Sequence, residues 1–294
     1  MRTGINLGKP GACERAFLPQ KRCDSTRRGL RVQQTHIGLY DCYIVSNMQV
    51  ATNIYEVVLL AGTLAQTIRP GQFLELAVPG SETQLVRVPL SYSQVDAHAG
   101  MIYITYAVVG SATKRLSQLP VKTKLNVLGP CGHGWQLPQS TKPALLIAGG
   151  VGAPPIIAAA SLLHEHGIVC DVILGAQTKD KLWGASQVSD AGARELFIST
   201  DDGSCGVKGF TTSVAKRLLD ERSYGTLFTC GPAPMMKGVA ALAAEYNIAC
   251  QASLERMMTC GFGVCNTCNV AMAQGGYKGC CTAGPVFDAK EVAW

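Results

Sequence analysis

Five of the chain's thirteen cysteines lie in one glycine-rich stretch near the C-terminus. Cys260, Cys265 and Cys268 have the spacing C-x4-C-x2-C, and Cys280 and Cys281 follow as neighbours. This spacing is typical of a plant-type [2Fe–2S] site, in which four thiolates hold two irons. Such a site constrains the fold strongly, because thiols from distant parts of the stretch must converge on one centre.

The glycines between these thiols fit the same chemistry. The sulfides of such a cluster are negatively charged, so backbone N–H groups must turn inward to meet them. Gly261 and Gly263 allow this approach without a side chain in the way. The alternatives are a zinc site and ordinary buried thiols, but zinc more often uses two C-x2-C pairs and the tail has one. The residues alone leave open whether Cys280 or Cys281 is the fourth ligand.

The composition describes a folded protein without a nucleic-acid-binding surface. Hydrophobic residues make up 47% of the chain and charged residues 16%, as in ordinary globular domains. Residues 1–36 hold eight Lys/Arg and two Asp/Glu, so the rest has 26 − 8 = 18 basic and 20 − 2 = 18 acidic residues. The net charge of +6 therefore resides in this leader, and we expect no nucleic-acid partner. We interpret residues 1–37 as a basic, disordered extension.

No membrane span and no secretory signal are expected. Residues 143–163 are uncharged, but the run Gly149-Gly150-Val151-Gly152 and the pair Pro154-Pro155 divide them into a strand, a turn and a helix start. The basic leader lacks a continuous apolar segment. Thirteen cysteines in such a chain indicate reduced thiols or metal ligands, and we expect a cytoplasmic protein.

Two regions of different pattern precede the cysteine tail. Residues 38–138 contain short β-rich runs separated by turns, which predict an antiparallel barrel or sandwich. Residues 139–250 alternate buried strands with helices, which predicts a doubly wound parallel sheet with ligands beyond the C-terminal ends of its strands. Residues 251–294 then form a small C-terminal subdomain around the cysteines.

One predicted turn of the α/β region suits a dinucleotide. Gly149, Gly150 and Gly152 lie between a strand and a helix, where helix N–H groups can meet phosphates. The pattern is weaker than G-x-G-x-x-G, because Pro155 stands where a third glycine belongs. A tight turn that only packs helix on strand is the alternative.

A second candidate segment is Cys230-Gly231-Pro232, which follows a strand and precedes a helix. A small polarizable side chain there fits beside a flat nicotinamide, although a merely buried cysteine explains it equally well.

Two segments of the β region also suit a cofactor. The run from Arg87 to Tyr92 places an arginine, a hydroxyl and an aromatic ring on one strand, where Arg87 can pair with a phosphate or simply face solvent. Gly110 and Ser111 open a predicted helix whose free N–H groups suit another phosphate.

Taken together, these motifs resemble the ferredoxin–NADP reductase superfamily and, more narrowly, the electron-transfer subunits of dihydroorotate dehydrogenase B. The resemblance covers about residues 40–294. It is most specific in "SLERMMTCGFGVCNTC" and "CCTAGPVFDAKEV".

The resemblance implies a fold with an antiparallel flavin barrel, a nucleotide-binding parallel-sheet domain and a [2Fe–2S] subdomain. It implies FAD in the barrel, NAD at the α/β domain, and cluster ligands Cys260, Cys265, Cys268 and Cys281. The flavin contacts it implies are Arg87, Pro89, Leu90, Ser91, Gly110, Ser111 and Thr113. The dinucleotide contacts are Gly149, Gly150, Gly152, Cys230, Gly231 and Pro232.

The resemblance also implies a partner and a reaction. The partner is an FMN-containing catalytic subunit that oxidises dihydroorotate to orotate in pyrimidine biosynthesis, in a hetero-oligomer that we expect to be a heterotetramer. The chain would carry the electrons to NAD+ and form NADH. It has no acid–base pair of its own in this scheme.

One departure and two rival functions stand beside this interpretation. The family's arginine directly before "P-[IL]-S" is Val88 here, and Arg87 comes one position earlier. Either a β-bulge turns the Arg87 side chain back toward the flavin, or backbone N–H groups hold the flavin phosphate.

The two rival functions are a ferredoxin–NADP(+) reductase or sulfide dehydrogenase subunit, and a zinc-containing interaction module. The segment "GAQTKDKL" lacks an arginine cluster for a 2′-phosphate, which favours NAD.

Overall fold

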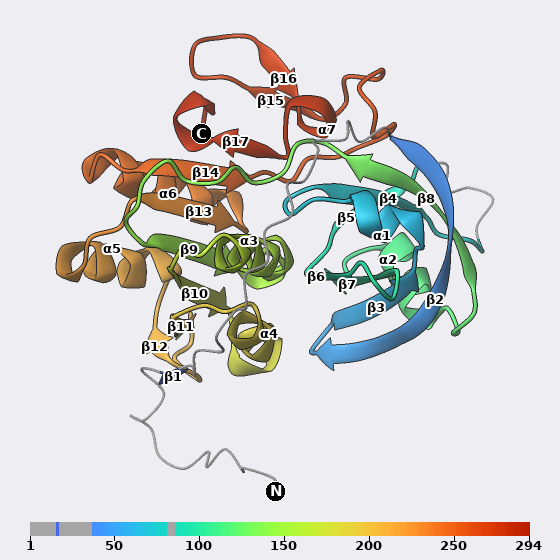
Figure 1. Ribbon diagram of the computed structural model, residues 1–294, viewed down its shortest axis with the longest axis horizontal. Helices are drawn as coiled ribbons and strands as arrows, with labels where there is room; N and C mark the ends of the chain where they lie inside the picture. Colours follow the sequence, from blue (N-terminus) through green and yellow to red (C-terminus); the bar gives the residue numbers. More distant parts are fainter. Residues whose placement is uncertain (1–15, 18–36, 81–85) are drawn as a thin grey trace, which may run out of the picture.

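An antiparallel β-barrel and an α/β unit lie side by side, and the C-terminal segment lies across the top of both in Figure 1. The computed structural model describes residues 16–17, 37–80 and 86–294. The predicted disordered extension, residues 1–37, falls outside the described residues except for 16–17 and 37. Residues Ala16–Phe17 form β1, which pairs antiparallel with a strand of the α/β sheet.

The barrel is a seven-stranded antiparallel sheet with the order β5-β4-β8-β2-β3-β7-β6. Its strands are β2 (Gly38–Ala51), β3 (Ile54–Leu60), β4 (Phe73–Ala77), β5 (Val88–Ser91), β6 (Gln94–Asp96), β7 (Met101–Ala107) and β8 (Lys124–Cys131). Alternate residues, such as Leu74 and Leu76 of β4, point into an apolar core. Two helices, α1 (Thr63–Thr67) and α2 (Ser111–Gln118), add Leu64 and Leu116 to that core.

The α/β unit has the sheet order β1-β11-β10-β9-β13-β14-β17, with β12 beside β11. Its strands are β9 (Ala144–Gly149), β10 (Cys170–Ala176), β11 (Glu195–Thr200), β12 (Val207–Lys208), β13 (Thr226–Cys230), β14 (Ala249–Ser253) and β17 (Val286–Asp288). Strands β9 to β14 pair in parallel, whereas β1 and β17 pair antiparallel at the two edges. The winding reverses between β9 and β13, and ligands of such sheets bind where that reversal occurs.

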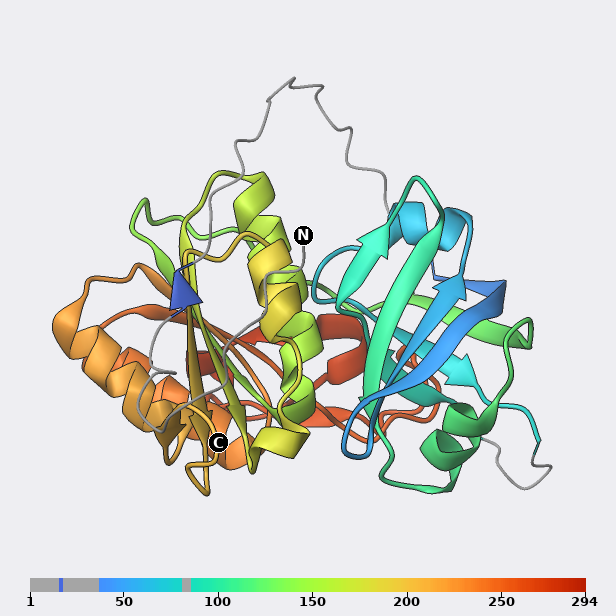
Figure 2. The same cartoon turned by 90° about the horizontal axis from the view of Figure 1, so that it is seen from below.

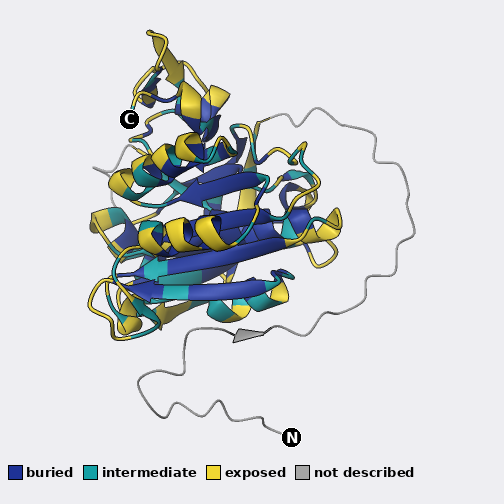
Figure 3. Ribbon diagram, turned by 90° about the vertical axis from the view of Figure 1, so that its left-hand side faces the viewer, coloured by how far each residue is buried: buried dark blue, intermediate teal, exposed yellow. Residues whose placement is uncertain are grey.

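Helices cover both faces of this sheet. They are α3 (Ala153–Glu165), α4 (Ala185–Asp190), α5 (Thr211–Glu221) and α6 (Ala233–Glu245). Helices α3 and α4 pack in one apolar core, and α5 and α6 pack in another on the opposite face. Figure 3 shows the strands buried between helices whose outer sides are exposed. The predicted β-barrel followed by a doubly wound parallel sheet is confirmed.

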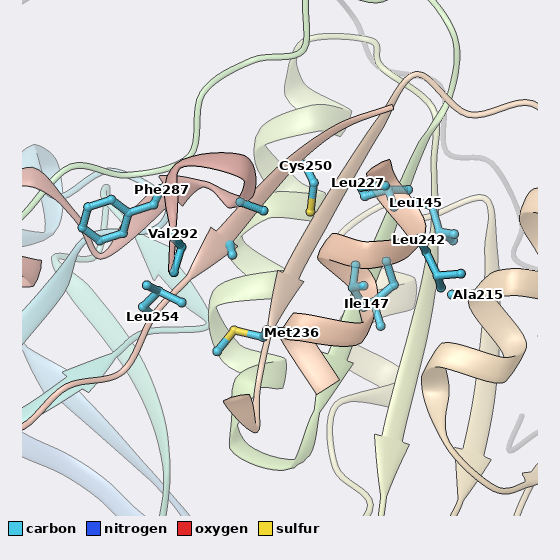
Figure 4. Packing of buried hydrophobic residues seen from close by; sticks show 14 of the residues in the cluster. Leu145, Ile147, Ala215, Leu227, Met236, Leu242, Cys250, Leu254, Phe287 and Val292 are labelled. Carbon is cyan, nitrogen blue, oxygen red and sulfur yellow. The ribbon is translucent and has the colours of Figure 1, made fainter. Parts of the chain in front are cut away.

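The C-terminal segment is joined to the α/β unit by shared packing. It contains β15 (Asn269–Ala271), β16 (Tyr277–Gly279) and α7 (Cys280–Ala283), followed by β17. Figure 4 shows Leu254, Phe287 and Val292 of this segment in the cluster that also holds Cys250 and Leu227. The predicted boundary between residues 250 and 251 lies inside β14. A segment this short buries too little surface to fold alone, which explains why it adds a strand to its neighbour's sheet.

The uncharged stretch 143–163 forms β9, a tight turn and the 13-residue helix α3, which crosses the middle of the molecule in Figure 2. No helix in the described part of the chain has the length and apolar character needed to cross a membrane.

Candidate functional site

A first cavity of about 500 Å³ lies between the barrel, the turn after β9 and the C-terminal segment. The predicted flavin contacts Pro89, Leu90 and Ser91 line it from β5, and Thr113 lines it from α2. Predominantly apolar walls with a few hydroxyls suit a flat aromatic ring system. Cys230 also lines this cavity, at its border with the α/β unit.

Gly110 and Ser111 lie beside the first cavity but do not line it. The N–H groups of Val109 and Gly110 donate to the Thr113 hydroxyl at 3.0 and 3.1 Å. These two donors are therefore used within the turn. A phosphate at this end would depend on the N–H groups of the first turn of α2.

Arg87 is the predicted flavin contact that the geometry does not support. Its Nη1 donates to the carbonyl oxygens of Asn126 at 2.9 Å and Glu75 at 3.3 Å, and Nη2 donates to Asn126 Oδ1. Val88 lines the cavity instead. The pairing of β4 with β5 runs from Val88 to Ser91 without a register shift, so no bulge turns the arginine toward the cavity.

A second cavity of about 870 Å³ lies beyond the C-terminal ends of the parallel strands. Residues of both predicted dinucleotide segments line it, namely Gly149, Gly150, Gly152, Gly231 and Pro232. The two turns approach closely, because a Cβ added to Gly152 would lie 2.2 Å from the carbonyl oxygen of Cys230. Glycine is required there by this approach, and the turn after β9 remains open to a phosphate.

The two cavities meet beside Cys230 and Glu255. Glu255 and Val151 line both cavities, and Cys230 and Gly231 line one each. Burial raises the pKa of the Cys230 thiol far above its usual range, so it is a neutral, polarizable group at this junction. Burial also raises the pKa of Glu255. Sequence reasoning missed Glu255, although it follows β14 closely, at the edge where ligands of a parallel sheet bind.

Asp201 is a second residue that sequence reasoning missed. The residue directly after β10 is Gln177, whereas Asp201 directly follows the adjacent strand β11 and lines the second cavity. Gln177 and Lys181 lie on the same wall, with Lys181 Nζ donating to Gln177 Oε1 at 2.6 Å. An acidic group in this place suits a ribose with free hydroxyls.

The four predicted cluster ligands form two pairs. The pKa of Cys265 is lowered to about 6 by hydrogen bonds with Thr267 and then with Cys260. The N–H of Cys281 donates to Cys268 Sγ at 3.3 Å. Within the described residues, no three Cys, His, Asp or Glu side chains are gathered as for a single metal ion. Two pairs of thiols match a two-iron cluster with two thiolates on each iron.

The backbone around these thiols also fits a cluster. Gly261 and Gly263 have φ of +78° and +92°, which L side chains rarely adopt. Burial and then the neighbouring Cys268 raise the pKa of Cys281, and a hydrogen bond from the N–H of Gly263 lowers it. Cys280 points elsewhere, since its Sγ donates to the carbonyl oxygen of Leu254 at 3.3 Å. This geometry supports Cys281 as the fourth ligand.

Comparison with known proteins agrees with this geometry. Residues 255–293 match the family described as the iron–sulfur cluster binding domain of dihydroorotate dehydrogenase B. The chain is 32% identical over 257 residues to a Fusobacterium nucleatum protein named dihydroorotate dehydrogenase B (NAD(+)), electron transfer subunit, covering 86% of this chain and 97% of that one. It is 36% identical to the protein of the same name from a Geobacillus species, covering 85% and 96%.

Solved structures show the same fold. A chain of an NADH-dependent reduced ferredoxin–NADP oxidoreductase has a TM-score of 0.78 at 29% identity, covering 86% of this chain and 89% of that one. An Amycolatopsis cytochrome P450 reductase has a TM-score of 0.60 at 21% identity, covering 72% and 68%. The second likeness bears on the fold alone.

Proposed function

This chain belongs to the family of dihydroorotate dehydrogenase B electron-transfer subunits, and we propose that its four thiols and two cavities form one electron path from a partner subunit to NAD+. It is an iron–sulfur flavoprotein that uses a nicotinamide dinucleotide and serves pyrimidine biosynthesis. When bound, the [2Fe–2S] cluster supplies one-electron transfer, and FAD and NAD+ supply hydride chemistry.

This proposal rests mainly on the order in which the four thiols, the first cavity and the second cavity lie along the molecule. Leu254, Met258 and Pro285 of the C-terminal segment line the first cavity. The same segment carries the four thiols, and one apolar core holds Cys268 and Cys281 together with Met258. Val151 and Glu255 line both the first and the second cavity. This arrangement supports a path in which the cluster, flavin and nicotinamide sites would follow one another without an intervening domain.

The chain's own residues then have positioning roles. Pro89, Leu90 and Ser91 would hold the flavin ring, and Thr113 would lie near its pyrophosphate. The glycines after β9 would bring the dinucleotide phosphates to the N-terminus of α3. Cys230, which is 2% exposed, would fill the junction with a neutral thiol and keep water away from the exchanged hydride.

The family name means that a catalytic subunit accompanies this chain, and we propose that this subunit contains FMN and joins it in a heterotetramer. We call residues 260–268, which carry three of the predicted ligands, the cluster loop. The exposed thiol of Cys265 and the exposed side chains of Phe262 and Val264 support a contact at this loop. We also propose a cytoplasmic location. Within the described residues, ten cysteines other than Cys205 have free thiols, which is consistent with it.

The decisive experiment compares two neighbouring thiols. Purified chain is mixed with the candidate FMN subunit, and dihydroorotate-dependent NAD+ reduction is measured with the absorption spectrum. Cys281→Ser should lose the iron–sulfur absorption, keep FAD and abolish the coupled reaction. Cys280→Ser is the matched control and should retain all three, because serine can make the same hydrogen bond to Leu254. Wild-type protein that contains no iron would refute the proposed path.

A ferredoxin–NADP(+) reductase is the second candidate function. It is favoured by the 29% identity to the reduced ferredoxin–NADP oxidoreductase chain. It predicts NADP(H) turnover with reduced ferredoxin and no response to dihydroorotate. Asp201 in the dinucleotide cavity weighs against it, because its charge would repel a 2′-phosphate.

A further inference from the structure

Glu75 on β4 is a buried carboxyl group that the electron path described above does not use. The residue is 1% exposed. Within the described part of the chain, neither Oε1 nor Oε2 has a hydrogen-bond partner. An isolated buried carboxylate is costly, so stability alone does not account for an acid at this position.

Strand β4 directs this side chain away from the barrel interior. Leu74 and Leu76 belong to the barrel core, and alternation along the strand turns Phe73 and Glu75 to the other face. Phe73 lines the flavin cavity and packs in the core that contains Cys268. Glu75 therefore lies on the strand that connects the flavin cavity with the cluster loop.

The cluster loop rests on the Glu75 carboxyl group. A Cβ added to Gly261 would lie 2.8 Å from Glu75 Cγ and 3.0 Å from Oε1. Gly261 directly follows the predicted ligand Cys260, and its φ of +78° turns the loop over the strand. A side chain at Gly261 would therefore separate the loop from the barrel.

Among the residues that the structure describes, no direct ion pair neutralises the carboxyl group. Arg87 lies nearby, but its Nη1 donates to the main-chain carbonyl oxygens of Glu75 and Asn126. Burial raises the pKa of Glu75 to about 7, and Arg87 lowers it. Because the carboxyl group lies directly under the backbone next to Cys260, charge on the cluster loop and charge on Glu75 influence each other.

We propose that Glu75 is a positioning residue of the cluster loop and that its carboxylate lowers the reduction potential of the [2Fe–2S] centre held there. This inference rests on the proposed function. An added electron makes the cluster more negative, and a carboxylate in a region of low dielectric disfavours that change. A lower potential makes the cluster pass its electron on to the flavin rather than retain it.

The test is a redox titration of the cluster by EPR spectroscopy at pH 8.5, in the complete chain with its cofactors. Glu75→Gln should favour the reduced cluster by about tenfold, which is about 59 mV for one electron. Glu75→Asp retains the charge and should stay within about threefold of wild type on the same scale.

Asp41→Asn is the control. Asp41 lies on the outer surface of β2, paired with Lys124 at 2.8 Å, and its side chain is 53% exposed. Solvent screens it, so its removal should leave the cluster potential unchanged.

The possible outcomes separate this inference from the proposed function. A cluster of wild-type potential in Glu75→Gln overturns the role of Glu75 and leaves the electron path intact. Loss of the cluster in both Glu75 variants, with FAD retained, also overturns it. Loss in Glu75→Gln with retention in Glu75→Asp supports it, because only the carboxylate distinguishes the two. Wild-type protein without iron would instead refute the proposed function.

Discussion

Gly152→Ala should disable the dinucleotide site without disturbing the iron–sulfur site. Gly152 precedes α3 and has an ordinary φ of −75°, so alanine causes no backbone strain there. The added Cβ would lie 2.2 Å from the carbonyl oxygen of Cys230 and 2.6 Å from the N of Gly231. Ordinary contacts of carbon atoms are about 3.5 Å or more, so the two turns must separate by roughly 1 Å.

This separation occurs where the two cavities meet. A misplacement of about 1 Å can cost about 100-fold in rate, which corresponds to about 2.7 kcal/mol of transition-state stabilisation. The assay is NADH oxidation with ferricyanide as electron acceptor, which requires the flavin and dinucleotide sites but no partner subunit. The visible spectrum and the EPR signal of the cluster should be those of wild type.

Gly167→Ala is the matched control for this substitution. Gly167 follows the far end of α3, lines neither cavity, has φ of +70°, and has no atom within 4 Å of an added Cβ. It should lose about 1–2 kcal/mol of stability from backbone strain, but it does not force the turns apart. Gly152→Ala with NADH turnover within about threefold of wild type would contradict the steric reasoning.

Three further predictions follow from single side chains. Asp201→Asn should raise kcat/KM for NADPH relative to NADH by about tenfold, about 1.4 kcal/mol, because it removes the charge that opposes a 2′-phosphate; an unchanged ratio would contradict its role. Asp171 is 0% exposed and accepts hydrogen bonds from Arg194, Arg222 and Tyr224, so Asp171→Asn should lower the free energy of unfolding by about 3–5 kcal/mol in urea denaturation. Burial raises the folded-state pKa of Glu75 from 4.5 to about 7, so its contribution to stability is fully present below pH 4.5 and is lost as pH rises toward 7. Wild type should thus lose up to about 3 kcal/mol relative to Glu75→Gln over this range, and parallel pH profiles of the two proteins would contradict the raised pKa.

The local features of this protein could be predicted from the spacing of residues along the chain. C-x4-C-x2-C identified three predicted ligands, because a short glycine-rich loop can bring its thiols together only in a few ways. The strand and helix patterns predicted a barrel followed by a doubly wound sheet, because periodicity reflects which side of each element is buried. The glycine turn after β9 was placed by the same reasoning.

The tertiary structure decided which distant residues meet. Cys280 and Cys281 are equivalent in spacing, and only the packing of α7 turns one toward Cys268 and the other toward Leu254. Arg87 was a candidate for pairing with a phosphate in the sequence, but in the fold its guanidinium donates to Asn126 on the neighbouring strand β8. Such orientations depend on packing between elements far apart in the chain, and no local pattern records that packing.

The surroundings of three acidic residues, Asp201, Glu255 and Glu75, could likewise not be predicted from the sequence. Glu75 and Asp201 have no indicative spacing around them in the sequence, and Glu255 lies within the stretch SLERMMTCGFGVCNTC without a pattern that indicates a role of its own. Asp201 and Glu255 become site residues because parallel strands end together at one edge of the sheet. Glu75 becomes a buried acid, without a hydrogen-bond partner among the described residues, because a loop almost two hundred positions later, at Gly261, covers it. Local spacing determined the chemistry that this chain carries, and the folding of remote segments onto each other determined the groups that surround it.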